Sequence, residues 1–274
     1  MVEYRTHPLK DGGSPELSAR PVPSAPPEIR TPAPIPAFTC SLNGVSGVRV
    51  AGERPARAAL LHFHGGGFTL GSAWDGLAFL KVVREALCVD AYSVDYSLAP
   101  GKKYPHQLKE GESFYQGLLE LGYEKIILAG ESAGGNLAVA LALRLMAQGK
   151  PGPAGVVSMS GLLDFSCDKG TDFLQKDLES MLKAYTYDRD PLLPGVSPVY
   201  ARLDGFPPLL LQAGTEESFR HHMERMALRA SKSDCPCVSS LWEGLGHAFT
   251  MEFDQYPEAQ DALGEVLDFM QTLL

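Results

Sequence analysis

Apolar residues along the chain fall into short runs that alternate with longer amphipathic stretches. The runs cover residues 58–63, 89–94, 126–129, 156–159, 209–212 and 238–242. Their length and apolar character predict buried strands. Helical spacing of apolar residues is found over 77–87, 107–121, 133–148, 217–231 and 256–274. Strands that alternate with helices predict a mostly parallel central sheet with helices on both faces.

Two regions depart from this alternation at the N-terminus. Residues 1–36 hold nine of the 21 prolines, and this Pro-rich N-terminal segment is expected to run without regular helix or sheet. Residues 38–50 instead predict a hairpin, with a turn around Asn43-Gly44 and Gly47. At 274 residues the chain can bury one large core, so residues 1–274 are expected to form a single domain.

A segment of about 162–200 is inserted between two of the predicted strands. Met181, Leu182 and Tyr185 lie at helical spacing within it, and Thr171 or Asp172 would serve as N-cap. A helix inserted here can form a small helical cap over the carboxyl ends of the strands, where ligands of α/β sheets bind. A peripheral helix with an ordinary apolar stripe is the alternative.

The composition of the chain limits which binding partners and which cellular compartment can be expected. A formal charge of −9 and a pI near 5.3 argue against a nucleic-acid or anionic-membrane surface. Five cysteines without framework spacing predict no disulfides, and Cys235-Pro236-Cys237 lacks the companions of a zinc site. The start of the chain has no apolar leader, and no run is long enough for a membrane span. We therefore expect a cytoplasmic protein, with the oligomeric state open and a homodimer among the options.

The run 126–129 ends in the glycine-rich stretch Gly130-Glu131-Ser132-Ala133-Gly134 and restarts as an apolar helix. Ser132 is therefore predicted at a strand-to-helix corner of the pattern G-x-S-x-G, the nucleophile elbow. A serine hydroxyl needs a base and the base needs an orienting carboxylate, so the corner predicts covalent chemistry with two partners. An ordinary glycine turn is the plain alternative.

The partners are expected after Ser132, in the order acid and then histidine. His247 follows a predicted strand in the loop 244–249, whereas His221 and His222 lie within a helical stretch as exposed residues. Carboxylates follow the strand 209–212 at Glu216 and Glu217; Glu216 is favoured as the first off the strand end, and Glu217 is the alternative. Asp190 precedes that strand and is discounted.

Three glycines follow the first parallel strand in His64-Gly65-Gly66-Gly67-Phe68. Bare amides of such a loop, together with that of Ala133, can bind an oxyanion. A phosphate loop is disfavoured because no G-K-[ST] or G-x-G-x-x-G follows. Phe68 and Trp74 could line a substrate pocket, or pack as core aromatics.

With these residues in view, the chain from about 58 to the C-terminus resembles the hormone-sensitive-lipase-like carboxylesterases of the α/β-hydrolase superfamily. The likeness rests on HGGGF (64–68), VDYSLAP (94–100), GESAGG (130–135), the stretch 197–217 and GLGHAF (244–249). It implies an α/β-hydrolase fold and hydrolysis of short- to medium-chain esters without metal or organic cofactor. It also implies roles for Ser132, Glu216 and His247 as the triad, and for Gly66, Gly67 and Ala133 as oxyanion donors.

This chain departs from the family pattern at two acids, because the family usually has Asp before the serine and Asp as the triad acid. Glu131 and Glu216 stand there instead. Two other activities fit the same motifs: a same-fold hydrolase or acyltransferase acting on amides or lactones, and a non-catalytic protein that binds small molecules.

Overall fold

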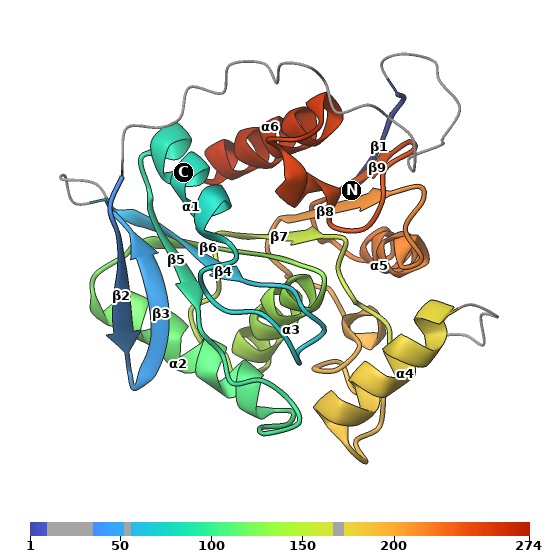
Figure 1. The fold of residues 1–274 in the computed structure, drawn as a ribbon, viewed down its shortest axis with the longest axis horizontal. Helices are drawn as coiled ribbons and strands as arrows, with labels where there is room; N and C mark the ends of the chain where they lie inside the picture. The colour runs from blue at the N-terminus through green and yellow to red at the C-terminus, as the bar shows by residue number, and fades with distance from the viewer. Residues whose placement is uncertain (10–34, 52–55, 167–172) are drawn as a thin grey trace.

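The computed structural model describes residues 1–9, 35–51, 56–166 and 173–274, and in this part of the chain nine strands form one sheet (Figure 1). The strands are β1 (Val2–His7), β2 (Ala37–Leu42), β3 (Val45–Val50), β4 (Ala58–Phe63), β5 (Asp90–Val94), β6 (Lys125–Glu131), β7 (Gly155–Met159), β8 (Leu209–Gly214) and β9 (Cys237–Trp242). The helices are α1 (Leu77–Leu87), α2 (His106–Glu120), α3 (Ala133–Ala147), α4 (Phe173–Thr186), α5 (Arg220–Ala230) and α6 (Pro257–Leu273), with short 3₁₀ helices η1 (Pro198–Tyr200) and η2 (Phe249–Glu252).

The sheet has the order β1-β9-β8-β7-β6-β4-β5-β3-β2. The strands from β1 to β5 in this order pair in parallel, and the pairs β5–β3 and β3–β2 are antiparallel. The central strands β5, β7 and β8 are buried at every residue, as expected of strands covered on both faces. The predicted mostly parallel sheet is confirmed.

Helices cover both faces of the sheet (Figure 1). α1 and α6 pack together on one face, and α2, α3 and α5 pack on the other. Each face has its own apolar core: Phe79, Val83 and Met270 belong to the first, and Phe114, Leu141 and Met226 to the second. Because the strands are parallel, the carboxyl ends of β4, β6, β8 and β9 meet at one edge, and the loops that leave them can share a site.

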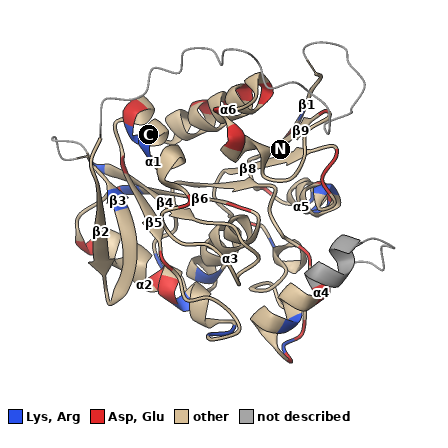
Figure 2. Cartoon of the chain, in the orientation of Figure 1, with Lys and Arg blue, Asp and Glu red and all other residues tan. Residues whose placement is uncertain are grey.

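Charged residues lie mainly on the helices and loops around this sheet (Figure 2). α6 is the most one-sided element, because its four charged residues, Glu258, Asp261, Glu265 and Asp268, are all acidic. α5 carries three arginines and one glutamate. The two helices therefore have opposite charge and flank the same end of the sheet, where the first strand of the chain is added.

The hairpin was predicted and is present, with its turn at Asn43-Gly44, where both residues have positive φ (47° and 81°). Such a two-residue turn matches the twist of the strands. Gly47, predicted near the turn, instead lies inside β3 opposite Cys40.

The prediction for residues 1–36 is wrong at its start. Residues 2–7 form β1, which pairs along its whole length with β9. The reason is local: the first proline is Pro8, and the residues before it, VEYRTH, include the β-formers Val2, Tyr4 and Thr6. The proline content is high over the 36 residues as a whole, but the six residues of β1 contain no proline.

Candidate active site

Ser132 lies between the last residue of β6 and the first residue of α3, in a conformation rare for a side-chain-bearing residue (φ 55°, ψ −119°). The glycines on either side make this turn sterically possible. A Cβ at Gly134 would overlap the carbonyl oxygen of Phe63, and a Cβ at Gly130 would overlap the backbone of Gly134. β4, β6 and α3 therefore meet at backbone contact distance, which presents the serine at the strand ends.

A pocket of about 570 Å³ opens over this turn. Residues from six separate parts of the chain line it. They are Gly65, Gly66, Gly67, Leu70, Gly71, Asp75, Glu131, Ser132, Leu162, Met181, Phe219, His247, Ala248, Met251 and Glu252. The predicted serine, histidine and oxyanion glycines are thus brought to one cavity.

His247 lies in the loop between β9 and η2. Its Nδ1 is 3.1 Å from Oε2 of Glu217, whose side chain is fully buried, while the histidine side chain is 36% exposed. The ring of Phe219 contacts the imidazole edge to face, with centroids 5.3 Å apart. The neighbouring amide of Ala248 donates to the hydroxyl of Ser160 at 3.0 Å. An acceptor at Nδ1 favours the tautomer with Nε2 unprotonated.

The expectation for the acid differs from what the structure places beside the histidine. Glu216 is exposed, accepts a hydrogen bond from the Thr215 hydroxyl at 3.1 Å and does not line the pocket. Glu217 meets His247 instead. β8 is longer than predicted, and beyond it the amides of Thr215 and Glu216 still bond the carbonyls of Trp242 and Leu245. The chain turns at these residues, and the turn leaves the side chain of Glu216 at the surface and buries that of Glu217.

Two other histidines follow the serine, on α5. His221 is partly exposed, but His222 is fully buried, contrary to the expectation that both are exposed. Burial, with charged neighbours adding to it, lowers the pKa of His222 to about 3, so its imidazole is neutral at neutral pH. Its ring contacts Phe219, which also contacts His247. Asp190 is exposed and does not line the pocket.

The glycine loop after β4 has two parts with different tasks. Gly66 and Gly67 have positive φ (98° and 60°) and line the pocket. Among the described residues, neither of their amides donates a hydrogen bond to another group. Gly65 is different, since its amide donates to Oε1 of Glu131 at 2.6 Å. The loop therefore offers two free donors near Ser132 and uses the third to hold its own shape.

Glu131 is a site residue to which the sequence analysis gave no role. Besides the Gly65 amide, its carboxylate bonds Nε2 of His62 at 2.7 Å. His62 is fully buried in β4, and its Nδ1 is 3.2 Å from the hydroxyl of Ser93 on β5. A histidine inside an otherwise apolar strand was the available signal, because a buried imidazole requires partners.

His64, at the start of the same loop, is also buried. Its ring stacks on Tyr96 at 4.1 Å, and burial lowers its pKa. The hydroxyl of Tyr96 donates to the carbonyl of His64 at 2.8 Å. This histidine therefore packs under the loop and supports it.

Neither aromatic residue predicted for the substrate pocket lines it. Phe68 is fully buried and stacks on Tyr185, with ring centroids 3.7 Å apart. Trp74 is 46% exposed and lines a separate hollow beside the β2–β3 hairpin. The apolar lining comes from residues that the sequence analysis did not select for this role: Leu70, Leu162, Met181, Phe219 and Met251.

Met181 shows that the inserted segment reaches the pocket. It belongs to α4, and a Cβ added at Gly67 would come within 2.6 Å of its Sδ. The Met181 side chain of α4 thus packs against the glycine loop that follows β4. The predicted N-cap, Thr171 or Asp172, lies outside the described residues.

No group of three or more His, Cys, Asp and Glu side chains in this part of the chain could hold a metal ion. None of the helices described here has the length and apolar character needed to cross a lipid bilayer.

Comparison with known proteins agrees with this architecture. Residues 60–251 match the α/β hydrolase fold family. An esterase of Acinetobacter venetianus is 34% identical over 85% of this chain and 80% of its own length. An acetyl-hydrolase of Streptomyces hygroscopicus is 30% identical, over 80% and 78% of the two chains. The crystal structure of a hormone-sensitive lipase from a metagenome library superposes with a TM-score of 0.80, at 28% identity, over 87% and 84%.

The described chain is an α/β hydrolase by its sheet order, elbow and family match. Within that superfamily it belongs to the hormone-sensitive-lipase-like family.

Proposed function

We propose that the protein is a serine carboxylesterase that hydrolyses short- to medium-chain acyl esters through an acyl-enzyme. Esterase and acetyl-hydrolase relatives support carboxylic ester hydrolysis as the reaction class. One observation carries the finer assignment: Ser132 and His247 line the same pocket, and the histidine is bonded to a fully buried carboxylate.

In the proposed mechanism, Ser132 is the nucleophile and His247 the general base. Glu217 accepts a hydrogen bond from the Nδ1–H group, which leaves Nε2 to take the hydroxyl proton as the serine oxygen attacks the ester carbonyl. The same imidazolium then protonates the leaving alkoxide, and an acyl-serine ester remains. Water, deprotonated by His247, attacks this ester and releases the acid.

Negative charge that develops on the carbonyl oxygen needs donors that are already in place. The amides of Gly66, Gly67 and Ala133 are the proposed oxyanion hole. Ala133 is the first residue of α3, so its N–H has no intrahelical partner and lies at the positive end of the helix dipole. Removal of one such donor typically costs about 10²- to 10³-fold in rate.

The acyl chain or the alcohol would occupy the apolar part of the pocket. Leu162, Met181, Phe219 and Met251 line this part. We propose that the segment 162–200 acts as a small cap here, because Met181 of α4 closes the cavity beside Gly67. A cavity of about 570 Å³ matches a small ester.

The test is turnover of p-nitrophenyl acetate and butyrate by the wild type and by Ser132→Ala. We expect kcat to fall by at least about 10⁴-fold in the variant, because the nucleophile is lost. A fluorophosphonate probe should label the wild type and not the variant. Equal turnover by the two proteins would remove the proposal, and an unlabelled wild type would favour a binding protein.

A further inference from the structure

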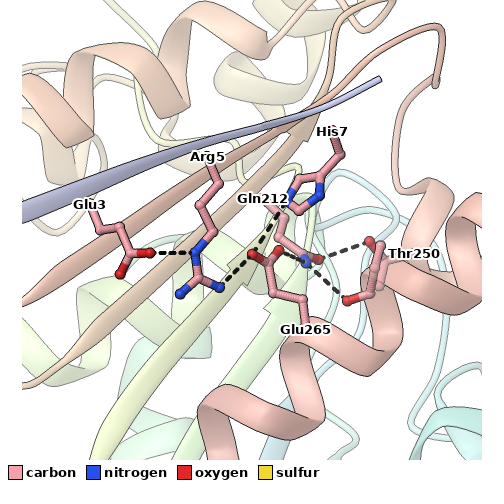
Figure 3. A network of polar contacts seen from close by, with 7 residues as sticks. Glu3, Arg5, His7, Gln212, Thr250 and Glu265 are labelled. Carbon is pink, nitrogen blue, oxygen red and sulfur yellow. Dashed lines mark hydrogen bonds and ion pairs between the residues drawn. The ribbon is translucent and has the colours of Figure 1, made fainter. Parts of the chain in front are cut away.

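A chain of polar side chains, buried except at its β1 end, connects the first strand with η2, the short helix that follows the His247 loop (Figure 3). Glu265 of α6 is paired with Arg5 of β1 at 3.0 Å, and His7 of β1 lies 3.6 Å from the same carboxylate oxygen. The other oxygen accepts from Nε2 of Gln212 on β8 at 2.7 Å. Oε1 of Gln212 accepts from the hydroxyl of Thr250 in η2 at 3.1 Å.

The orientation of Gln212 within this chain is fixed by its partners. Its Nε2 faces the Glu265 carboxylate and the carbonyl of Ala262, at 3.0 Å, and both groups only accept. Its Oε1 must then face Thr250, whose hydroxyl can donate. Gln212 is fully buried and Thr250 is 1% exposed, so no water is at hand to replace a lost partner.

Gln212 reaches the loop of His247 by two routes. Its side chain bonds Thr250, three residues after the histidine. Its backbone carbonyl accepts the amide of Ser160 at 2.7 Å, and the Ser160 hydroxyl accepts the amide of Ala248 at 3.0 Å. The segment that directly follows the exposed histidine is thus held at two points, Ala248 and Thr250, by bonds that lead to one residue of β8.

We propose that Gln212 and Thr250 are positioning residues for His247, and that Glu265, anchored by Arg5 of β1, sets the orientation of Gln212. The inference rests on the proposed function, since it takes His247 as the general base. It gives β1 a task in the reaction: this strand, 240 residues from the histidine in sequence, holds the far end of the chain that fixes the catalytic loop.

Thr250→Val tests the proposal, because it removes the hydroxyl at nearly constant volume. We expect kcat for p-nitrophenyl butyrate to fall about 10-fold, since a slight misplacement of a catalytic group slows the chemical step. KM should stay within about two-fold, because the hydroxyl does not line the pocket. Thr250→Ser restores the donor and should restore most of kcat.

Thr272→Val is the matched control. This threonine lies on α6, is exposed, and its hydroxyl bonds the carbonyl of Phe269 outside the chain of Figure 3. Its variant should keep the wild-type kcat. Circular dichroism and a thermal midpoint for each variant establish that the folded fractions are equal at the assay temperature.

Arg5→Met tests the same chain of hydrogen bonds at its other end, and it provides the test if Thr250→Val does not fold. Arg5 is 40% exposed at its side chain, so its loss leaves the core intact. We expect a two- to three-fold lower kcat at unchanged KM.

The proposal is overturned if Thr250→Val keeps the wild-type kcat, or if Thr250→Val and Thr250→Ser lose kcat equally. If Thr250→Val does not fold, a folded Arg5→Met with unchanged kcat overturns it. Failure of the proposed function itself would look different, because Ser132→Ala would then retain activity.

Discussion

The two halves of the site are held by different forces. On the serine side, bare glycine backbone lets β4, β6 and α3 meet at contact distance in the turn that carries Ser132. On the histidine side, the loop after β9 is joined to the segments after β8 and β7 by single hydrogen bonds, from His247 to Glu217 and from Ala248 to Ser160. The steric constraints of the serine turn require glycines at fixed spacing, so they can be recognised in the sequence as a motif. Hydrogen bonds between loops that are distant in the sequence leave no such motif.

Glu217→Gln gives the largest effect expected on the histidine side. An amide cannot stabilise the imidazolium, and it can hold the ring in the wrong tautomer, so kcat should fall about 10³- to 10⁴-fold, as in the known Asp-to-Asn case of the serine proteases. The measurement is steady-state hydrolysis of p-nitrophenyl butyrate at pH 7.

Glu216→Gln is the matched control for this prediction, one residue away in the same turn. Its carboxylate is exposed and bonds only a neighbouring threonine, so its kcat should stay within about two-fold of the wild type. A collapse of activity in Glu216→Gln with little change in Glu217→Gln would reverse the assignment of the acid.

The carboxylate beside His247 shows where sequence reasoning stops. The order serine, acid, histidine and the strand 209–212 located the turn that contacts His247, but favoured Glu216 over the neighbouring Glu217, which makes the contact. The choice depends on how far β8 continues beside β9, which is set by backbone pairing across the sheet. The ladder ends at Gly214, and the turn beyond it decides which carboxylate is buried.

The residues that line the pocket were also not predictable, because the fold and not the distance along the chain decides which side chains reach it. Phe68 follows the oxyanion loop in sequence, but a positive φ (64°) turns its ring away to stack on Tyr185. Met181 lies more than a hundred residues away and reaches the cavity. By contrast, the strand and helix positions near the elbow were predictable, because each depends on local apolar periodicity that burial on both faces of the sheet reinforces.

Glu131 offers a test of the serine side, since its carboxylate holds the glycine loop beside Ser132 by a hydrogen bond. Glu131→Leu removes the acceptor of the Gly65 amide and should lower kcat by about 10- to 100-fold, through a displaced oxyanion loop. Steady-state kinetics and the rate of fluorophosphonate labelling should fall together.

Glu131→Gln is the milder partner of that variant. Its amide oxygen can still accept from Gly65. Its NH₂ can face Nε2 of His62 once the imidazole proton moves to Nδ1 and is donated to Ser93. Most of the activity should survive. Equal, severe losses in both variants would show that the negative charge itself is needed.

The smallest expected effect is on the free energy of unfolding, and it comes from His222, the buried histidine whose ring packs on Phe219 behind His247. The pKa of His222 is about 3 in the folded protein, below the value of about 6.5 in an unfolded chain. Protonation therefore favours unfolding. The contribution of the neutral ring is complete above about pH 6.5 and is lost as pH falls from there toward 3. Between pH 7 and pH 5 this amounts to about 2 kcal/mol at most.

Urea unfolding at pH 7 and pH 5 measures this loss, with His222→Gln and His221→Gln as the compared variants. The first should lose less stability on acidification than the wild type does, because glutamine does not titrate. The second should follow the wild type, since His221 is partly exposed. If all three proteins lose the same stability, the neutral buried imidazole is not the source. The loss of stability on acidification would then come from groups other than His222.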